Sequence, residues 1–352
     1  MYPKTQQLEL LLDYLAPQAR TMPEHDWQGW HLQRISGGMN KIVLRASRAE
    51  AEDGAGDAAG DGAGDGAGDE ADIAIKFTWP DGRDRAGHEF SALCLLDRLH
   101  LKLAPRPLYF SDTRYAQPVV VQTWLAGEVR AGLPATPDEW HCLLAHLRAV
   151  HQVTPDMSGR VGITLSRANL SPASPLTLVH LAHALIADMP GDELTPELIQ
   201  VMRHLDRAHL SGETESTALI RCDPNTPNFI RRSDGWRSVD WEYSGWGDPA
   251  FTIGEMLAHP KYLGLDEATW AWVIDAYCAG AKVGDTVTPA RIAAYRTAML
   301  AWWAAKCEQN MWLNAKHAGG RLVPLPADWR KQTLDLRARY IAAALSATRG
   351  VS

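Results

Sequence analysis

A change in hydrophobic period near residue 125 constrains the fold more than any other feature of this chain. Before it, short apolar runs around turns predict strands in the stretches 31–47, 71–77, 106–110 and 118–125. A single helical stripe, residues 82–100, interrupts these strands. Beyond residue 136 the apolar spacing is mostly helical, over residues 138–153, 174–189, 195–210, 267–281 and 289–316.

A chain of 352 residues is too long for one average domain, so we expect two lobes. The pattern predicts an α+β fold, with a small β-rich lobe over residues 1–124 and a larger, mainly helical lobe over residues 125–352. Strand-like runs interrupt the helical lobe around residues 217–241, and they surround the most polar loop of the chain.

A low-complexity insert lies inside the β-rich lobe, at about residues 48–72. It repeats Gly, Ala and Asp, with Asp at positions 53, 57, 61, 65 and 69. Such a composition cannot bury apolar surface, so we expect a flexible, solvated segment that joins two strands of a hairpin. A calcium-binding repeat is the alternative, because spaced carboxylates can bind Ca²⁺, but the spacing does not match an EF-hand.

Composition argues against several classes of protein. Residues 48–72 hold nine acidic residues and one basic residue, a charge of −8 against a formal net charge of −7 for the chain, so the remainder is about +1 and no nucleic-acid partner is expected. No run of 18 apolar residues occurs, so we expect no membrane partner. The N-terminus lacks the pattern of a signal peptide, and five scattered cysteines without a CxxC pair favour neither zinc nor disulfides. A cytoplasmic protein, monomeric or homodimeric, is expected.

Two acidic segments carry the chemistry. ALIRCDPNTPNFI, residues 218–230, holds Asp223 and Asn228, and SVDWEYSGWGDPAF, residues 238–251, holds Asp240. Phosphoryl transfer needs a group that accepts the proton of the incoming hydroxyl, together with cations on the phosphates. Mg²⁺ prefers hard oxygen ligands. Asp223 therefore fits a catalytic role, and Asn228 and Asp240 fit the role of metal ligands.

These segments resemble the aminoglycoside phosphotransferase/choline kinase family, the small-molecule branch of the protein-kinase-like fold. The family pattern H-x-D-x-x-x-x-N, followed about a dozen residues later by I-D-W/F-E, is similar to residues 221–228 and 239–242. Residues 243–251 are similar to the segment that follows in the family. The resemblance implies a two-lobed protein-kinase-like fold. It also implies a kinase that moves the γ-phosphate of ATP, with Mg²⁺ and with GTP not excluded, to the hydroxyl of a small molecule.

The resemblance also implies roles in the β-rich lobe. Lys76 would meet the α- and β-phosphates and pair with Glu89, while a glycine turn would cradle phosphates with its backbone N–H groups. The strand that ends at residue 125 would lead into a hinge that binds adenine. The implied nucleotide-binding residues are Ser36, Gly37, Gly38, Asn40, Lys76, Glu89, Gln122 and Trp124. Glu242 would support the metal site or bind a second metal ion.

One position departs from the family pattern. Arg221 stands where the family has a His that props the catalytic loop. The arginine could prop the loop in the same way, or pair with Asp223 or Asp240; a close pairing would weaken Asp223 as a proton acceptor. The alternative reading is therefore a nucleotide-binding pseudokinase with a regulatory or scaffold role. A protein kinase proper is disfavoured because D-F-G and A-P-E are missing.

The substrate is less constrained. Fourteen tryptophans, several of them in the helical lobe, could form an aromatic box for a quaternary amine such as choline, although core packing is the alternative for each. Carboxylates such as Glu255 would instead suit a polyamine such as an aminoglycoside. The candidate substrate residues are Trp246, Asp248 and Glu308.

Overall fold

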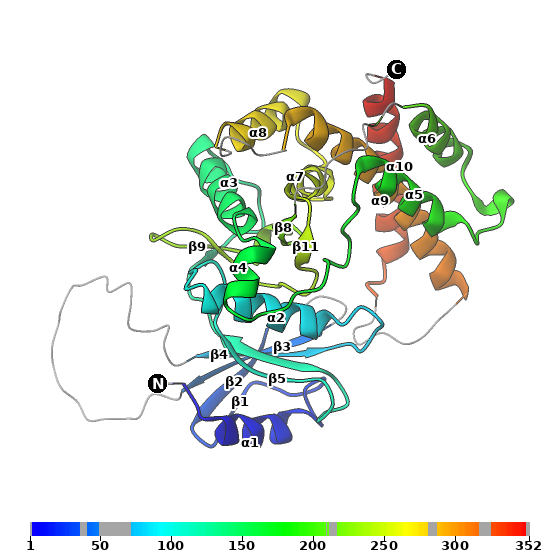
Figure 1. The fold of residues 1–352 in the computed structure, drawn as a ribbon. Coiled ribbons are helices and arrows are strands. Elements are labelled where there is room, and N and C mark those ends of the chain that lie inside the picture. The colour runs from blue at the N-terminus through cyan, green and yellow to red at the C-terminus, as the bar shows by residue number, and fades with distance from the viewer. Residues whose placement is uncertain are drawn as a thin grey trace. The chain divides into compact units, whose positions relative to one another are not determined.

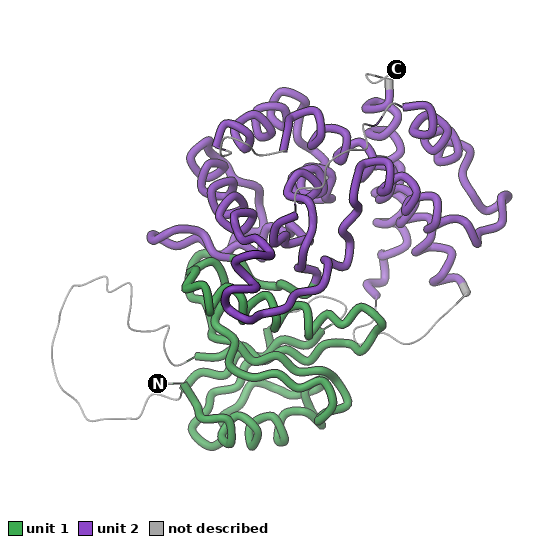
Figure 2. The backbone as a smooth tube through the Cα atoms, viewed as in Figure 1, with its two compact units in different colours: residues 1–128, 238–242, 321–324 green, residues 129–237, 243–320, 325–352 purple. Residues whose placement is uncertain are grey.

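The computed structural model describes residues 2–35, 41–48, 72–208, 210, 217–280, 287–316 and 325–349. The chain forms two compact units (Figure 2). Unit 1 comprises residues 1–128, 238–242 and 321–324, and unit 2 comprises residues 129–237, 243–320 and 325–352. The short segment 238–242, which carries Asp240 and Glu242, therefore belongs to unit 1 although its chain neighbours on both sides belong to unit 2. The glycine turn and residues 49–71 of the acidic insert lie outside the described residues.

Unit 1 is built on a six-stranded antiparallel sheet (Figure 1). In order across the sheet, its strands are β1 (His25–Trp27), β2 (Trp30–Ile35), β3 (Lys41–Arg48), β4 (Ile73–Thr78), β6 (Val119–Thr123) and β5 (Pro107–Ser111). Two helices accompany the sheet, α1 (Thr5–Leu15) and α2 (Arg85–Arg98). The predicted strands and the helical stripe at 82–100 are confirmed, and β3 and β4 pair on either side of the insert as expected.

The two faces of this sheet differ in polarity because side chains alternate along a strand. One face contributes Ile42, Leu44, Ile75 and other apolar residues to a core that also contains the leucines of α1. Lys41 is opposite Thr78 and Val43 is opposite Lys76 in the β3–β4 register. Lys41 and Lys76 therefore share the second face of the sheet.

Unit 2 is mainly helical. Its helices are α3 (Pro137–His151), α4 (Pro155–Arg160), α5 (Pro175–Ile186), α6 (Pro196–Arg207), α7 (Pro249–Ala258), α8 (Glu267–Ala279), α9 (Pro289–Lys316) and α10 (Trp329–Arg349). The five helical stretches predicted beyond residue 136 are confirmed as α3, α5, α6, α8 and α9, whereas α4, α7 and α10 were not anticipated. Within the described residues, no helix is long and apolar enough to cross a membrane.

Helix starts in unit 2 follow a simple sequence signal. A Ser, Thr or Asp side chain accepts a hydrogen bond from a backbone N–H of the first turn, and proline takes the first helical position, where its missing N–H costs nothing. The cap–proline pairs are Thr136-Pro137 of α3, Thr154-Pro155 of α4, Ser174-Pro175 of α5 and Asp248-Pro249 of α7. The aspartate of the DPAF sequence is thus a helix cap.

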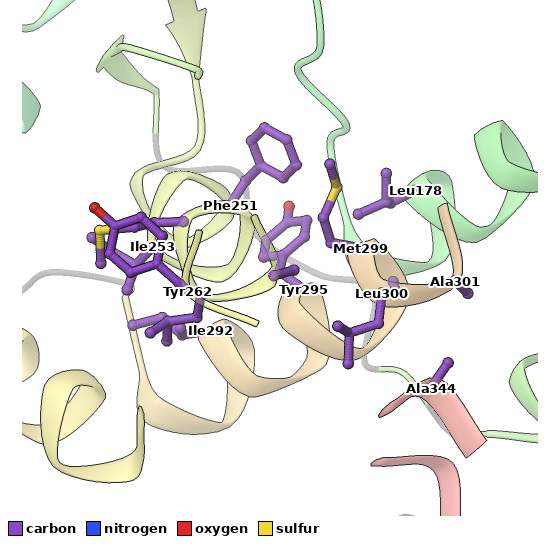
Figure 3. Packing of buried hydrophobic residues seen from close by; sticks show 14 of the residues in the cluster. Leu178, Phe251, Ile253, Tyr262, Ile292, Tyr295, Met299, Leu300, Ala301 and Ala344 are labelled. Carbon is purple, nitrogen blue, oxygen red and sulfur yellow. The ribbon is translucent and has the colours of Figure 1, made fainter. Parts of the chain in front are cut away.

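The core of unit 2 is centred on α9, which packs against α5, α7 and α10. Figure 3 shows Phe251 of α7 beside Tyr295 of α9, whose ring centroids are 5.6 Å apart. Gly254 allows this close approach, because a Cβ at that position would lie 2.7 Å from the Cβ of Tyr295. The tight α7–α9 contact fixes α7, the helix whose Glu255 accepts a hydrogen bond from the backbone of Asp223.

Short strands frame the polar loops. β8 (Ala218–Ile220) pairs antiparallel with β11 (Gly245–Gly247). Residues 221–244 therefore form a long connection that begins and ends at this pair of strands. Within this stretch, β9 (Phe229–Arg231) neighbours β10 (Arg237–Ser238), as the predicted hairpin requires, and β9 also neighbours β7 (Glu128–Val129). The predicted catalytic and metal-binding residues all lie in this connection, between β8 and β11.

Candidate active site

Asp223 and Asp240 share an unusual backbone conformation. Their φ angles are 69° and 67°, in the left-handed region, and only three other non-glycine residues are recorded there within the described part of the chain. Aspartate tolerates this conformation better than most residues, but it still costs about 1 kcal/mol or more. Such strain tends to persist where the surrounding structure fixes a side chain for function. Both aspartates of the sequence motif are therefore among the five non-glycine residues that have this conformation in the described part of the chain.

The loop that carries Asp223 is held from several directions in unit 2. Asn228 Nδ2 donates to Asp223 Oδ2 at 3.1 Å, and Thr226 Oγ1 donates to the carbonyl oxygen of Ala131 at 2.7 Å. Arg221 is almost fully buried, donates to the carbonyl oxygen of Asp223 at 2.9 Å, and stacks over the ring of Phe229. Arg221 thus holds the loop backbone. Cys222 is also buried, and burial raises the pKa of its thiol well above its usual range, which disfavours a nucleophile.

Two groups from α7 and its C-terminal cap lie behind Asp223. Glu255 Oε1 accepts the backbone N–H of Asp223 at 3.3 Å, and His259 Nε2 is 3.7 Å from Asp223 Oδ1. The Nδ1 atom of His259 accepts the N–H of Lys261 at 3.3 Å. In the neutral ring the proton is therefore on Nε2, the nitrogen nearer to Asp223.

Burial sets the charge of both groups. Burial, reinforced by the charge of Asp223, raises the pKa of Glu255 to about 8, so this carboxyl is mainly protonated at pH 7. Burial, with smaller contributions from Lys261 and Arg221, lowers the pKa of His259 to about 4, so the ring is neutral. The sequence interpretation missed His259 because it did not recognise α7. The cap–proline start at Asp248 was the signal that could have revealed the helix.

The predicted lysine–glutamate pair is present in unit 1. Lys76 Nζ on β4 donates to Glu89 Oε1 on α2, and both side chains are almost fully buried. The same Glu89 oxygen lies 3.5 Å from the backbone N of Trp241, in the segment 238–242. Glu89 therefore links the strand lysine to the segment that carries Asp240. Nucleotide contacts by Lys76 remain a prediction.

A second lysine, absent from the sequence interpretation, contacts that segment directly. Lys41 Nζ on β3 donates to Asp240 Oδ1 and lies 3.6 Å from Glu242 Oε2. Arg85 Nη1 at the start of α2 is 4.0 Å from Glu242 Oε1. Burial, together with the charge of Asp240, raises the pKa of Glu242 to about 7. Burial alone would lower the pKa of Lys41, but the charges of Asp240 and Glu242 outweigh it and raise that pKa.

The donor chemistry of the predicted ligands fits Mg²⁺. Asp240 offers a carboxylate, and Asn228 has its amide nitrogen turned to Asp223, which leaves the amide oxygen for a cation. Among the described residues, no group of three or more His, Cys, Asp or Glu could hold an ion by itself. A small set of hard oxygen ligands completed by phosphates and water is the usual arrangement for Mg²⁺ with a nucleotide.

Two of the candidate substrate residues are instead structural, and those predictions are corrected. Asp248 is 1% exposed, and it accepts hydrogen bonds from Arg291 Nε, Tyr295 Oη and the N–H of Ala250, each at 2.9 Å. This carboxylate caps α7 and has no surface to offer a ligand.

Glu308 on α9 is likewise 3% exposed, and it accepts from Arg337 Nη1 at 2.6 Å and from the N–H of Thr195 at 3.3 Å. Its carboxylate joins α9 to its neighbours. Trp246 is partly exposed on β11, where its backbone is paired with Leu219, and a substrate contact by its ring stays a prediction.

The remaining candidates concern the nucleotide. Gln122 is buried on β6 opposite Ala74, which places it on the sheet face that also carries Lys76. Trp124 follows β6, donates its N–H to the carbonyl of Asp72 at 2.9 Å, and its ring lies under the Arg45 guanidinium. Four candidates lie outside the described residues: Ser36, Gly37, Gly38 and Asn40.

Comparison with known proteins identifies a family and several relatives that resemble this chain. The APH family model, described as "Phosphotransferase enzyme family", matches residues 79–295, more than half of the chain. Thiamine kinases of Salmonella typhimurium and Salmonella paratyphi A are 29% identical over 190 residues. That match covers 53% of this chain and 57% of each relative, so the chain spans little more than half the length of the curated relatives it matches.

Solved structures share the fold. A choline/ethanolamine kinase family protein from Mesorhizobium loti superposes with a TM-score of 0.56 at 17% identity, over 95% of this chain and 99% of that one. A choline kinase from Streptococcus pneumoniae gives 0.57 at 12% identity, over 96% and 100%. The GDP complex of aminoglycoside 2'-phosphotransferase-IIIa gives 0.57 at 11% identity, over 97% and 99%. The fold is therefore the predicted α+β, protein-kinase-like fold, with a β-sheet N-terminal part and a helical C-terminal part.

Proposed function

Because the chain belongs to the phosphotransferase enzyme family, we propose that it transfers the γ-phosphoryl group of ATP, bound with Mg²⁺, to a hydroxyl of a small molecule. The observation that carries this proposal is the setting of Asp223. Its backbone is left-handed, its carboxylate receives the amide of Asn228, and the neutral ring of His259 lies 3.7 Å away. A fixed carboxylate beside neutral groups suits a proton acceptor for a hydroxyl.

The role of Arg221 favours an active kinase over a pseudokinase. The sequence left open whether this arginine pairs with a catalytic carboxylate. Arg221 donates a hydrogen bond to the backbone carbonyl of Asp223, and its guanidinium stacks on Phe229. These are the contacts of a residue that props the loop, which is the function that the family's His would have had.

We assign nucleotide binding to the N-terminal part, residues 1–124, and catalysis and substrate binding to residues 125–352. Lys76, oriented by Glu89, would bind phosphate oxygens as a buried point charge. Asp240 and Asn228 would hold Mg²⁺, which neutralises phosphate charge when bound. Asp223 would orient the incoming hydroxyl and take its proton as the new oxygen–phosphorus bond forms, while the bond from the γ-phosphorus to the bridging oxygen breaks and ADP leaves.

For the substrate, we favour an alcohol on an organic cation, with thiamine as the first candidate. The curated relatives are thiamine kinases, and choline kinases share the fold. Trp303 lies 6.2 Å from His259, centroid to centroid, and Trp302 lies 5.3 Å from Trp303. Both indoles are only partly buried, so aromatic surface is available near Asp223 for a cationic ring.

An ADP-release assay with Mg-ATP tests the proposal across thiamine, choline, ethanolamine and aminoglycosides. Asp223→Asn serves as the blank, and Asp188→Asn, an exposed aspartate of the same unit, serves as the matched control. We expect an acceptor-dependent signal that Asp188→Asn keeps and Asp223→Asn loses. Confirmed Mg-ATP binding without transfer to any acceptor would instead favour the pseudokinase.

A further inference from the structure

Lys41, which the sequence interpretation did not include, belongs to a cluster of buried charged side chains in unit 1. It is 7% exposed, and its ammonium group donates to Asp240 and lies 3.6 Å from Glu242. Both carboxylates are in the segment 238–242, about two hundred residues further along the chain. The lysine therefore occupies the position beside Asp240 that a bound cation would take.

The cluster balances its charges without a metal ion. Its carboxylates are Glu89, Asp240 and Glu242, and its cations are Lys41, Lys76 and Arg85; Arg85 also pairs with Asp81 at 2.7 Å, and Asp81 in turn pairs with Arg83. Lys76 contacts Glu89, while Lys41 contacts the other two carboxylates. A divalent cation that joined Asp240 with Lys41 in place would face an ammonium at short range in a buried, weakly screening environment. Metal binding and the observed Lys41 contact therefore oppose each other.

We propose that Lys41 is a resident counter-cation of the metal-binding carboxylates, and that it exchanges Asp240 for nucleotide phosphate when the metal enters. This inference rests on the proposed function. A lysine suits such an exchange because its ammonium is a compact point charge on a flexible four-carbon stem, and phosphate oxygens accept its hydrogen bonds as carboxylates do. The free protein should then bind divalent cations poorly, and nucleotide should promote metal entry.

Lys41→Met tests the proposal through Mn²⁺ binding in the absence of nucleotide, measured by the loss of the free Mn²⁺ spin-resonance signal. We expect binding at least about tenfold tighter than in the wild type, because an ammonium no longer competes at Asp240. Lys76→Met is the matched control, since it removes the same charge from a neighbouring strand position whose contact is Glu89. Circular dichroism checks folding, and Lys41→Gln, which keeps a donor toward the carboxylates, replaces a Lys41→Met protein that does not fold.

A second measurement separates exchange from simple charge removal. Affinity for Mg-ADP, measured by calorimetry, should fall in Lys41→Met by about tenfold while Mn²⁺ affinity rises, because the same ammonium group is lost to the phosphates. Lys41→Arg keeps a cation and should resemble the wild type in both assays. Opposite changes in the two affinities are not expected from a lysine that only stabilises the fold.

Three results would overturn the proposal: unchanged Mn²⁺ affinity in Lys41→Met, an equal gain in Lys76→Met, or a rise of both affinities together in Lys41→Met. Adding Asp240→Asn to Lys41→Met should abolish the gain, and a gain that persists would also overturn it. The ADP-release assay on the wild type is independent of these results. Failure of the lysine exchange thus leaves the kinase activity standing, whereas a silent acceptor panel would count against the proposed function.

Discussion

Asp223 in unit 2 and Asp240 in unit 1 have nearly the same backbone conformation but different neighbours. The Asp223 carboxylate meets the amide of Asn228 and the neutral ring of His259. The Asp240 carboxylate meets the ammonium of Lys41. The difference in surroundings is consistent with the two roles proposed for these residues. Neutral donors suit a carboxylate that accepts a proton, and a cationic neighbour suits one that will exchange that cation for a metal ion.

The largest effect should come from Asp223→Asn, which removes the proton acceptor with little change in shape. We expect kcat to fall by about a thousandfold. Affinity for Mg-ADP should stay within about twofold, because asparagine keeps a side-chain oxygen that can accept the amide of Asn228, the proposed metal ligand. Steady-state kinetics and calorimetry measure the two quantities. A comparable loss of nucleotide affinity would show that the two aspartates do not differ in role.

Asp240→Asn should change the binding of Mg²⁺ more than the transfer of the proton. The amide is a weaker ligand for Mg²⁺, and the substitution removes the nearer of the two carboxylates that Lys41 contacts. We expect the Mg²⁺ concentration needed for half-maximal rate to rise by about tenfold or more. A magnesium titration of the rate at saturating ATP measures this change. An unaltered magnesium requirement would remove Asp240 from the metal site.

Acid should weaken unit 2 before unit 1. Burial, with the charge of Arg221, lowers the pKa of His146 on α3 to about 3, and burial, with a contribution from His146, lowers that of His151 to about 3. Below pH 6.5 the unfolded chain binds protons at both residues and the folded unit does not, so the free energy of unfolding falls as pH falls toward 3. Together the two histidines should lower the free energy of unfolding by about 2 kcal/mol as the pH falls from 6.5 to 5.5.

His31 in unit 1 shows the opposite tendency, because hydrogen bonds from its ring to Asp26 and Glu24 raise its pKa. Urea unfolding at several pH values, followed by hydrogen exchange of each unit, tests this contrast. His146→Gln should flatten the pH dependence in unit 2. An equal loss of stability in the two units as the pH falls would contradict the prediction that His146 and His151 make unit 2 the more acid-sensitive one.

A smaller effect is expected from His259→Ala. The ring offers an Nε2–H toward Asp223, and the N–H of Lys261 holds its tautomer. Losing one hydrogen-bond donor beside a charged group should lower kcat by about tenfold and leave the magnesium requirement unchanged. His259→Gln, which can still donate, should recover part of the rate. A shift in magnesium requirement instead would mean that His259 acts on the metal side.

Local signals in the sequence were sufficient for much of the fold. Alternation and helical spacing located strands β2 to β6 of unit 1 and five helices of unit 2, because those elements bury one regular face. Helix α10 was not predicted, and few of its positions, such as Tyr340 and Ala344, are fully buried. The motif grouped Asp223, Asn228 and Asp240, which all lie in the connection between β8 and β11.

Long-range contacts explain what the sequence could not predict. Lys41 contacts Asp240 across 199 positions of sequence, and no local pattern encodes that pairing. The errors at Asp248 and Glu308 have a similar cause, because Arg291 and Arg337, which satisfy them, come from elsewhere in the chain. A polar residue in a motif looks available until its tertiary partners are known.

The most direct test of the account is ADP binding with and without Mg²⁺, measured by calorimetry on Asp223→Asn and Asp240→Asn side by side. We expect Mg²⁺ to strengthen ADP binding in Asp223→Asn as it does in the wild type, and we expect this enhancement to be lost in Asp240→Asn. An enhancement that disappears in Asp223→Asn, or that survives in Asp240→Asn, would contradict the assignment of proton transfer to one aspartate and metal binding to the other.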